Sequence, residues 1–191
     1  LGEMKRVLRR HRDAEAYLLR ALAILDKRGI GEHPYAVLTL WFLALTYADQ
    51  KLYGKAEPLY HRGLAIAART LPPDHPHTGC LLRDLARLHY STGEYEESEA
   101  LYQRAAAILE KSFGSEDPML AEALAGYARV LRRLHRKKEA AGLEQRAKSI
   151  LESQGMYRGP LTVDAGGLDR GENLNHRGQA GNTVSRSRVQ P

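Results

Sequence analysis

The chain has 191 residues, of which 43% are hydrophobic and 27% are charged, and these proportions are typical of a folded globular protein. The formal net charge of +6 permits an acidic partner but does not by itself indicate a nucleic-acid site. Cys80 is the one cysteine, which excludes an internal disulfide. We therefore expect a buried, structural thiol and a reducing, cytoplasmic location. The longest nearly apolar run, residues 36–48, is too short to span a bilayer, so no membrane partner is expected.

The sequence repeats itself at an interval of 42 residues. His33-Pro34 aligns with His75-Pro76 and with Asp117-Pro118, and many apolar positions agree at the same offset without a gap. Such self-similarity indicates an array of stacked structural units. The interval predicts a partial repeat, three repeats and a tail, with the boundaries 1–32, 33–74, 75–116, 117–154 and 155–191.

Each unit is expected to contain two helices. Its apolar residues recur at intervals of three and four, which is the helical period, and glycines fall between the periodic segments. In chain order the predicted helices cover about 10–28, 33–50, 54–70, 76–92, 95–113, 118–135 and 137–153. The helix at 10–28 aligns with the second helix of each later unit, and no first helix is predicted before it. This unpaired helix predicts that the chain is a fragment of a longer protein.

The polar–proline pair that recurs every 42 residues predicts the start of the first helix in each unit. Proline is favoured at the first helical position, and the residue before it is pushed out of helical geometry, which suits an N-cap. A ring nitrogen of His33 or His75 can accept the same hydrogen bond as the Asp117 carboxylate. The alternative is a metal site built from His33, His75 and His77. We favour the capping interpretation, because equivalent positions in a stack lie a repeat apart whereas metal ligands must converge.

From Gly155 onward the interval stops, and the chain becomes rich in glycine and poor in large apolar residues. Such a segment cannot bury enough surface to offset its ordering entropy, so we expect a disordered tail over residues 155–191.

The repeat follows the spacing large–x2–Leu–small–x2–Tyr, followed by Ala–x3–aromatic–x2–Ala, with Gly63 at the last position in the first unit. In the first unit these positions are Leu40, Leu43, Ala44, Tyr47, Ala56, Tyr60 and Gly63. Over about residues 10–153 the sequence resembles tetratricopeptide repeat proteins of the 42-residue type found in kinesin light chains. The resemblance implies an all-α fold, an α-α superhelix of about seven antiparallel helices. The third unit departs from the pattern, because Glu144 replaces the aromatic residue and "RRLHRKK" at 132–138 replaces a turn with glycine.

The resemblance further implies that a concave groove, lined by the first helix of each unit, binds a partner polypeptide. The groove-facing positions are Leu38, Trp41, Leu45, Asp49, Arg83, Arg87, Tyr90, Arg129, Arg132 and Arg133. Such a groove is apolar near Trp41 and rich in arginine elsewhere, and arginine forks suit carboxylates. We therefore expect an acidic, extended peptide with a hydrophobic anchor near Trp41. The alternative is that Trp41 packs under the preceding helix and that the arginines are merely solvated.

No pattern in the sequence indicates catalysis. The "HRD" triplet at 11–13 lacks the asparagine that a kinase catalytic loop has five residues after the aspartate, since Leu18 stands there. Serine-hydrolase, zinc-protease and phosphate-loop motifs are missing too. We expect a protein-binding scaffold without enzymatic activity, cofactor or metal. The alternatives are a regulatory or sensor region of a larger protein and, ranked lower, an RNA-binding helical repeat.

Overall fold

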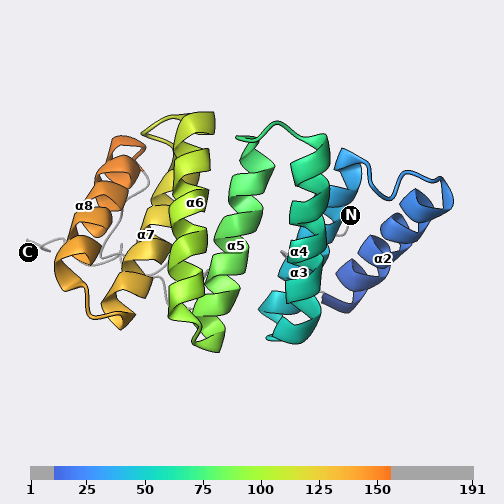
Figure 1. Cartoon of the computed structure of the whole chain (residues 1–191), viewed down its shortest axis with the longest axis horizontal. Coiled ribbons are helices and arrows are strands. Elements are labelled where there is room, and N and C mark those ends of the chain that lie inside the picture. Colours follow the sequence, from blue (N-terminus) through green and yellow to red (C-terminus); the bar gives the residue numbers. More distant parts are fainter. Residues whose placement is uncertain (1–10, 156–191) are drawn as a thin grey trace, which may run out of the picture. The chain divides into compact units, whose positions relative to one another are not determined.

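The computed structural model describes residues 11–155, which form seven α-helices and no strand (Figure 1). In chain order these are α2 (His11–Lys27), α3 (Pro34–Asp49), α4 (Tyr53–Thr70), α5 (Pro76–Thr92), α6 (Tyr95–Phe113), α7 (Pro118–Arg133) and α8 (Lys137–Ser153). The predicted all-α fold is confirmed, and each predicted helix end lies within about two residues of the observed one. The predicted disorder of the tail falls, apart from Gly155, outside the described residues.

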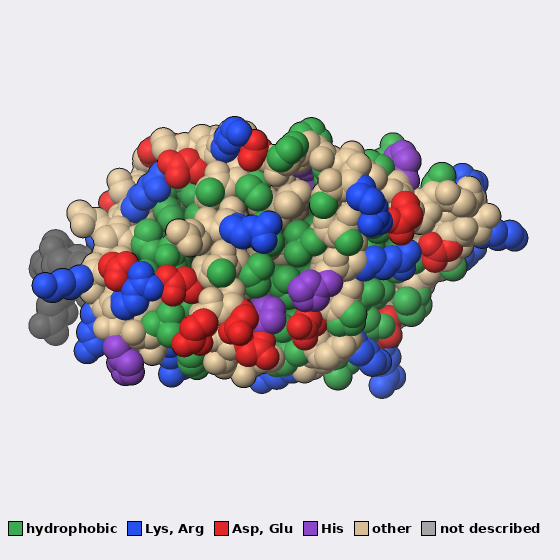
Figure 2. Space-filling model, viewed as in Figure 1, with side chains coloured by type: hydrophobic (Ala, Val, Ile, Leu, Met, Phe, Trp, Pro, Cys, Tyr) green, Lys and Arg blue, Asp and Glu red, His purple; other side chains and the backbone are tan. Residues whose placement is uncertain are grey.

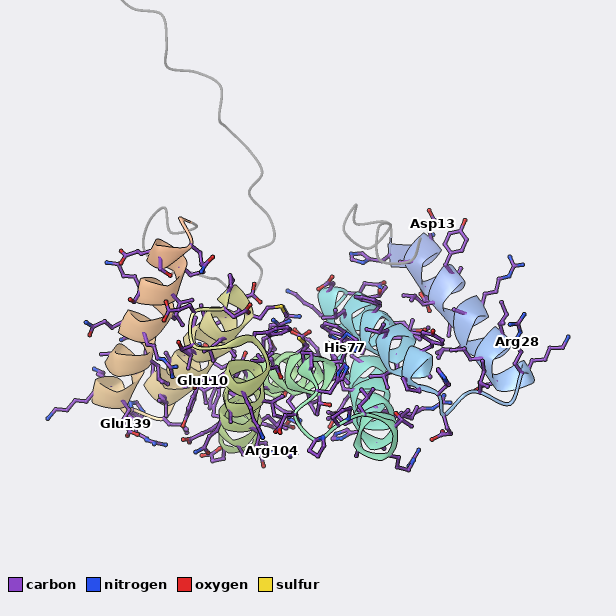
Figure 3. All side chains as sticks on the ribbon, turned by 90° about the horizontal axis from the view of Figure 1, so that it is seen from above. Asp13, Arg28, His77, Arg104, Glu110 and Glu139 are labelled. Atoms are coloured by element: carbon purple, nitrogen blue, oxygen red, sulfur yellow. The ribbon has the colours of Figure 1, made fainter. Side chains whose placement is uncertain are left out.

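The helices of residues 11–155 pack in two layers. Each helix contacts its neighbours in the chain, and the first helices also contact one another, α5 touching both α3 and α7. The second helices α4 and α6 are not in contact with each other. Because the first helices lie closer together than the second helices, the stack bends toward α3, α5 and α7, and Figure 3 shows this row of helices from above. We call the solvent-facing side of α3, α5 and α7 the first-helix face.

The recurring polar–proline pairs are N-caps, as the sequence predicts. The Nδ1 atoms of His33 and His75 accept hydrogen bonds from the backbone N–H two residues later, at 3.3 and 3.2 Å. The Asp117 carboxylate accepts the equivalent bond at 2.7 Å. In each unit the proline occupies the first helical turn, where its missing N–H leaves no hydrogen bond unmade. The polar–proline pair that recurs every 42 residues therefore marks the start of the first helix in each unit.

Neighbouring units approach closely where one side chain is small. Gly126 of α7 faces the ring of Tyr102 of α6, and a Cβ atom at position 126 would lie less than 3.0 Å from that ring. Within the second unit, the buried Ser98 hydroxyl donates to the Ala86 carbonyl at 2.7 Å and so ties α6 to α5. The contact with Tyr102 leaves no room for a larger residue at position 126.

The third unit differs from the others at the positions that the sequence marks. Glu144 takes the place of the buried tyrosines Tyr60 and Tyr102, and the Arg132 Nε donates to its carboxylate at 2.6 Å. His135 occupies the place of Lys51 and Gly93, and all three residues adopt a left-handed backbone, with φ angles of 61°, 60° and 92° respectively. The turn therefore keeps its conformation without glycine, and α7 ends at Arg133 rather than at the predicted residue 135.

Candidate protein-binding face

A buried carboxylate lies at the centre of the first-helix face. Asp84 of α5 is 2% exposed, and its Oδ2 accepts a hydrogen bond from the Trp41 Nε1 of α3 at 2.7 Å. The Arg83 Nε donates to Oδ1 of the same carboxylate at 3.2 Å, and the Arg87 guanidinium lies 3.5 Å from it. Asp84 therefore brings together Trp41, Arg83 and Arg87, three residues that the sequence predicts to line a groove. The role of Asp84 itself was not predicted from the sequence.

Asp84 remains ionised in this setting. Burial alone would raise the pKa of its carboxyl group, but the guanidinium groups of Arg83 and Arg87 and the hydrogen bond from Trp41 together lower that pKa. The same pairing raises the pKa of Arg87. Asp84 thus neutralises much of the positive charge that the sequence suggests for this part of the face.

The network continues to the third first helix. The Arg83 Nη1 donates to the Glu122 carboxylate of α7 at 2.8 Å. The side chain of Arg83 is only 13% exposed, whereas that of Glu122 is 65% exposed. Polar contacts therefore link α3, α5 and α7 through Trp41, Asp84, Arg83 and Glu122, and hold the three helices in one arrangement.

At the far end of the face, arginines lie over aromatic rings. The guanidinium carbon atoms of Arg129 and Arg133 are 5.7 and 5.9 Å from the centroid of the Tyr90 ring. Arg133 also lies 5.9 Å from the ring of Tyr95, and its Nε donates to the Tyr90 hydroxyl at 3.3 Å. We call Tyr90, Tyr95, Arg129 and Arg133 the tyrosine–arginine corner. It combines cation–π contacts with guanidinium N–H groups that can bind a carboxylate.

The remaining predicted groove residues lie in different settings. Leu38 is half-buried and Leu45 is 6% exposed, so Leu45 contributes to packing. Asp49 is exposed at the last position of α3. Arg132 is paired with Glu144 of α8.

A signal for Asp84 was present in the repeat itself. At the 42-residue offset, Asp84 aligns with Phe42 and Gly126, so a charged residue occupies an apolar or small position. Such a substitution requires nearby partners, because an unpaired buried charge is costly. The adjacent arginines in the sequence are those partners.

Cys80 is 3% exposed, and burial raises the pKa of its thiol to about 11. The thiol is therefore protonated near neutral pH, in agreement with the predicted structural role. None of the helices within residues 11–155 combines the length and apolar character that crossing a bilayer requires.

Three overlapping segments, 1–69, 35–111 and 78–153, match the family model described as tetratricopeptide repeat. The chain belongs to the tetratricopeptide repeat family. Repeats of this family generally mediate protein–protein interaction and are typically not enzymes. No curated protein gives a significant match to the sequence.

Several solved structures are similar to this tetratricopeptide repeat chain. BtubC (BKLC) from P. vanneervenii is 20% identical, with a TM-score of 0.71 over 98% of this chain and 68% of that one. A structure of the nearly identical TPR-like repeats of a putative kinesin light chain from Podosopora anserina is also similar. Its sequence is 26% identical to this chain, and the TM-score is 0.63 over 81% of this chain and 74% of that one. A second structure of the same repeats, carrying a methionine substitution, is 25% identical, with a TM-score of 0.65 over 82% of this chain and 74% of that one. These likenesses agree with the resemblance noted in the sequence.

Proposed function

We propose that this chain is a protein-interaction scaffold that binds an extended, acidic peptide segment of a partner protein along the first-helix face. The family supports a protein partner, and the bend toward α3, α5 and α7 makes this face the inner side of the stack. The cytoplasmic location expected from the single cysteine is part of the same proposal.

The tyrosine–arginine corner is the observation that carries the proposal. Arg83 and Arg87 already share the Asp84 carboxylate, so they offer little charge to a ligand. The side chain of Arg133 is exposed. Among residues 11–155 it contacts the Tyr90 hydroxyl and the rings of Tyr90 and Tyr95 rather than a carboxylate. A ligand carboxylate at Arg133 would form a charge-assisted, forked hydrogen bond beside an aromatic surface.

The half-buried Trp41 gives the other end of the face its apolar character. Its ring stacks on Phe42 with a centroid distance of 5.3 Å and lies 6.2 Å from His77. Because its indole N–H is bound to Asp84, only the exposed part of the ring is available to a ligand. We therefore place an apolar ligand residue near Trp41 and an acidic one near Arg133.

Selection of a random peptide library on the immobilised chain tests this proposal. We expect enrichment of peptides with an acidic residue and an apolar residue several positions apart. Arg133→Glu should weaken binding of the selected peptides about tenfold, which corresponds to loss of one charge-assisted hydrogen bond. Fluorescence anisotropy measures the affinity.

The matched control is Arg104→Glu, because Arg104 is also exposed but lies on the second helix α6 (Figure 3). This variant should bind the selected peptides as the unmodified chain does. Equal weakening by both variants, or enrichment of peptides without acidic residues, would show that the corner does not recognise a carboxylate.

A further inference from the structure

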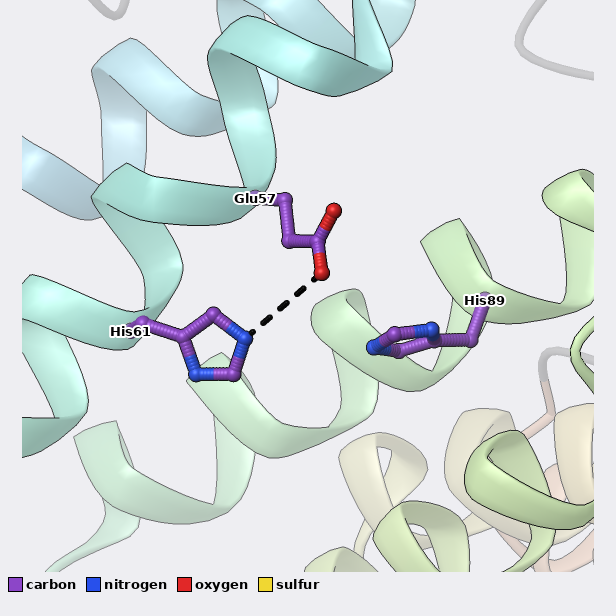
Figure 4. A group of neighbouring side chains, drawn as sticks. All are labelled: Glu57, His61 and His89. Carbon is purple, nitrogen blue, oxygen red and sulfur yellow. Dashed lines mark ion pairs between the residues drawn. The ribbon is translucent and has the colours of Figure 1, made fainter.

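Three potential metal ligands converge at the junction between the first and second full units. Glu57 and His61 lie one turn apart on α4, and His89 lies near the end of α5 (Figure 4). One ligand atom from each side chain lies within 4.8 Å of the others, and the Glu57 carboxylate is 3.8 Å from the His61 Nε2. Within residues 11–155 this is the group of three His, Cys, Asp or Glu side chains that could hold a metal ion.

We propose that Glu57, His61 and His89 bind a divalent transition-metal ion, with zinc as the best match, and that the ion joins α4 to α5. Two imidazole nitrogens and one carboxylate oxygen form a ligand set that zinc accepts, with a fourth position left for water. Calcium and magnesium prefer oxygen ligands and are poor matches to this set. This site is separate from the first-helix face and does not depend on the proposed peptide binding.

His89 is already oriented as a metal ligand. The residue is 8% exposed, and its Nδ1 is hydrogen-bonded to the Glu94 carboxylate. That bond leaves Nε2 as the free nitrogen, and Figure 4 shows the outer ring nitrogen of His89 directed toward Glu57 and His61. A carboxylate that fixes the other ring nitrogen is the usual support of a zinc-bound histidine.

The other two ligands can move into place. The side chains of His61 and Glu57 are 59% and 43% exposed, and both rise from one helix at an i,i+4 spacing. Ligand atoms around a tetrahedral zinc ion lie about 3.3 Å apart, so rotation of these exposed side chains has to shorten the separations, which are within 4.8 Å, by up to about 1.5 Å. On the face shown in Figure 2, histidine and acidic side chains lie next to one another near the middle, open to solvent.

The repeat shows that this combination is specific to one junction. Glu15 and Glu99 are the equivalents of Glu57 at the 42-residue offset. At the preceding junction the Tyr47 hydroxyl takes the place of His89 and donates to Glu15 at 2.7 Å. At the following junction Leu131 stands in the place of His89. Within the part of the chain that the structure describes, the glutamate at this repeat position therefore lies next to two histidines only where α4 contacts α5.

The sequence alone does not indicate these ligands, because the histidines come from different units and follow no metal-binding spacing. His61 and His89 are brought together by the packing of α4 on α5, whereas the recurring histidines His33 and His75 serve as caps.

Titration of the full, tag-free chain with Zn²⁺ and Co²⁺ tests the proposal. We expect saturable binding of one ion per chain and, for Co²⁺, the visible absorption of a four- or five-coordinate nitrogen–oxygen site. At a free zinc concentration about 100 times the dissociation constant, the melting temperature should rise by about 5–10 °C. Absence of saturable binding, or an unchanged melting temperature at saturation, would overturn the proposal.

The repeat supplies conservative variants for each ligand. His89→Tyr copies the preceding junction, His61→Gln copies the equivalent Gln103, and Glu57→Gln keeps the shape of the side chain. Each should fold and lose at least about tenfold in zinc affinity. The control His135→Asn removes an exposed histidine in a turn and should bind zinc normally. Retained affinity in all three ligand variants would place the ion elsewhere and refute the site.

Discussion

Asp84 is the residue on which the arrangement of the first-helix face depends. It is buried, it accepts from Trp41 of the preceding unit, and it holds two arginines of its own helix. A buried charge with these partners fixes the geometry, because each partner would be left unsatisfied by any other arrangement.

Replacement of Asp84 by asparagine should therefore destabilise the chain by about 3 kcal/mol, because Arg83 and Arg87 would lose their buried counter-charge. Urea unfolding followed by circular dichroism measures the free energy of unfolding. The control Asp26→Asn removes an exposed pair with Arg62 and should cost less than about 1 kcal/mol. Similar losses for the two variants would contradict the central role of Asp84.

The Asp84 carboxylate also makes the free energy of unfolding depend on pH. Because its pKa is lower in the folded chain than in the unfolded chain, its contribution to stability is complete above the unfolded pKa of about 4. That contribution disappears as the pH falls through the lower, folded pKa. Unfolding free energies measured from neutral to acidic pH should therefore fall more steeply for the unmodified chain than for Asp84→Asn. Parallel curves would show that Asp84 does not titrate as described.

The helices are the part of the molecule that the sequence predicts best. Proline at the first helical turn and the cap before it mark the starts of α3, α5 and α7 independently of tertiary contacts. The end of α7 is less well predicted, because His135 adopts a left-handed backbone that the sequence signals only where glycine is present. The partner of Trp41 depends on how α3 packs against α5, which local patterns do not contain. The cluster of Glu57, His61 and His89 depends in the same way on the packing of α4 against α5.

Packing between neighbouring elements can be tested at two glycines. Gly126→Ala in α7 would place a methyl group less than 3.0 Å from the Tyr102 ring and should destabilise the chain by about 1–3 kcal/mol. Gly142→Ala in α8 meets no atom within 4 Å and should stabilise it by about 0.5–1 kcal/mol. Thermal unfolding of both variants measures these changes. A neutral Gly126→Ala would show that α6 and α7 are less closely packed than described.

At the scale of the whole stack, residues 11–155 combine a row of first helices in mutual contact with two separate chemical features. The first-helix face has a neutralised centre at Asp84 and a cationic, aromatic corner at Tyr90 and Arg133. The junction of α4 with α5 carries the ligands Glu57, His61 and His89. Peptide binding and metal binding are therefore expected to respond to different substitutions.

The most direct test of the proposed function is hydrogen–deuterium exchange of the chain with and without a peptide selected on it. Binding along the first-helix face should slow exchange in α3, α5 and α7, with the largest effect in the segments that contain Trp41 and Arg133. Protection confined to the second helices α4, α6 and α8, or no protection at a saturating peptide concentration, would contradict the proposed role of the first-helix face.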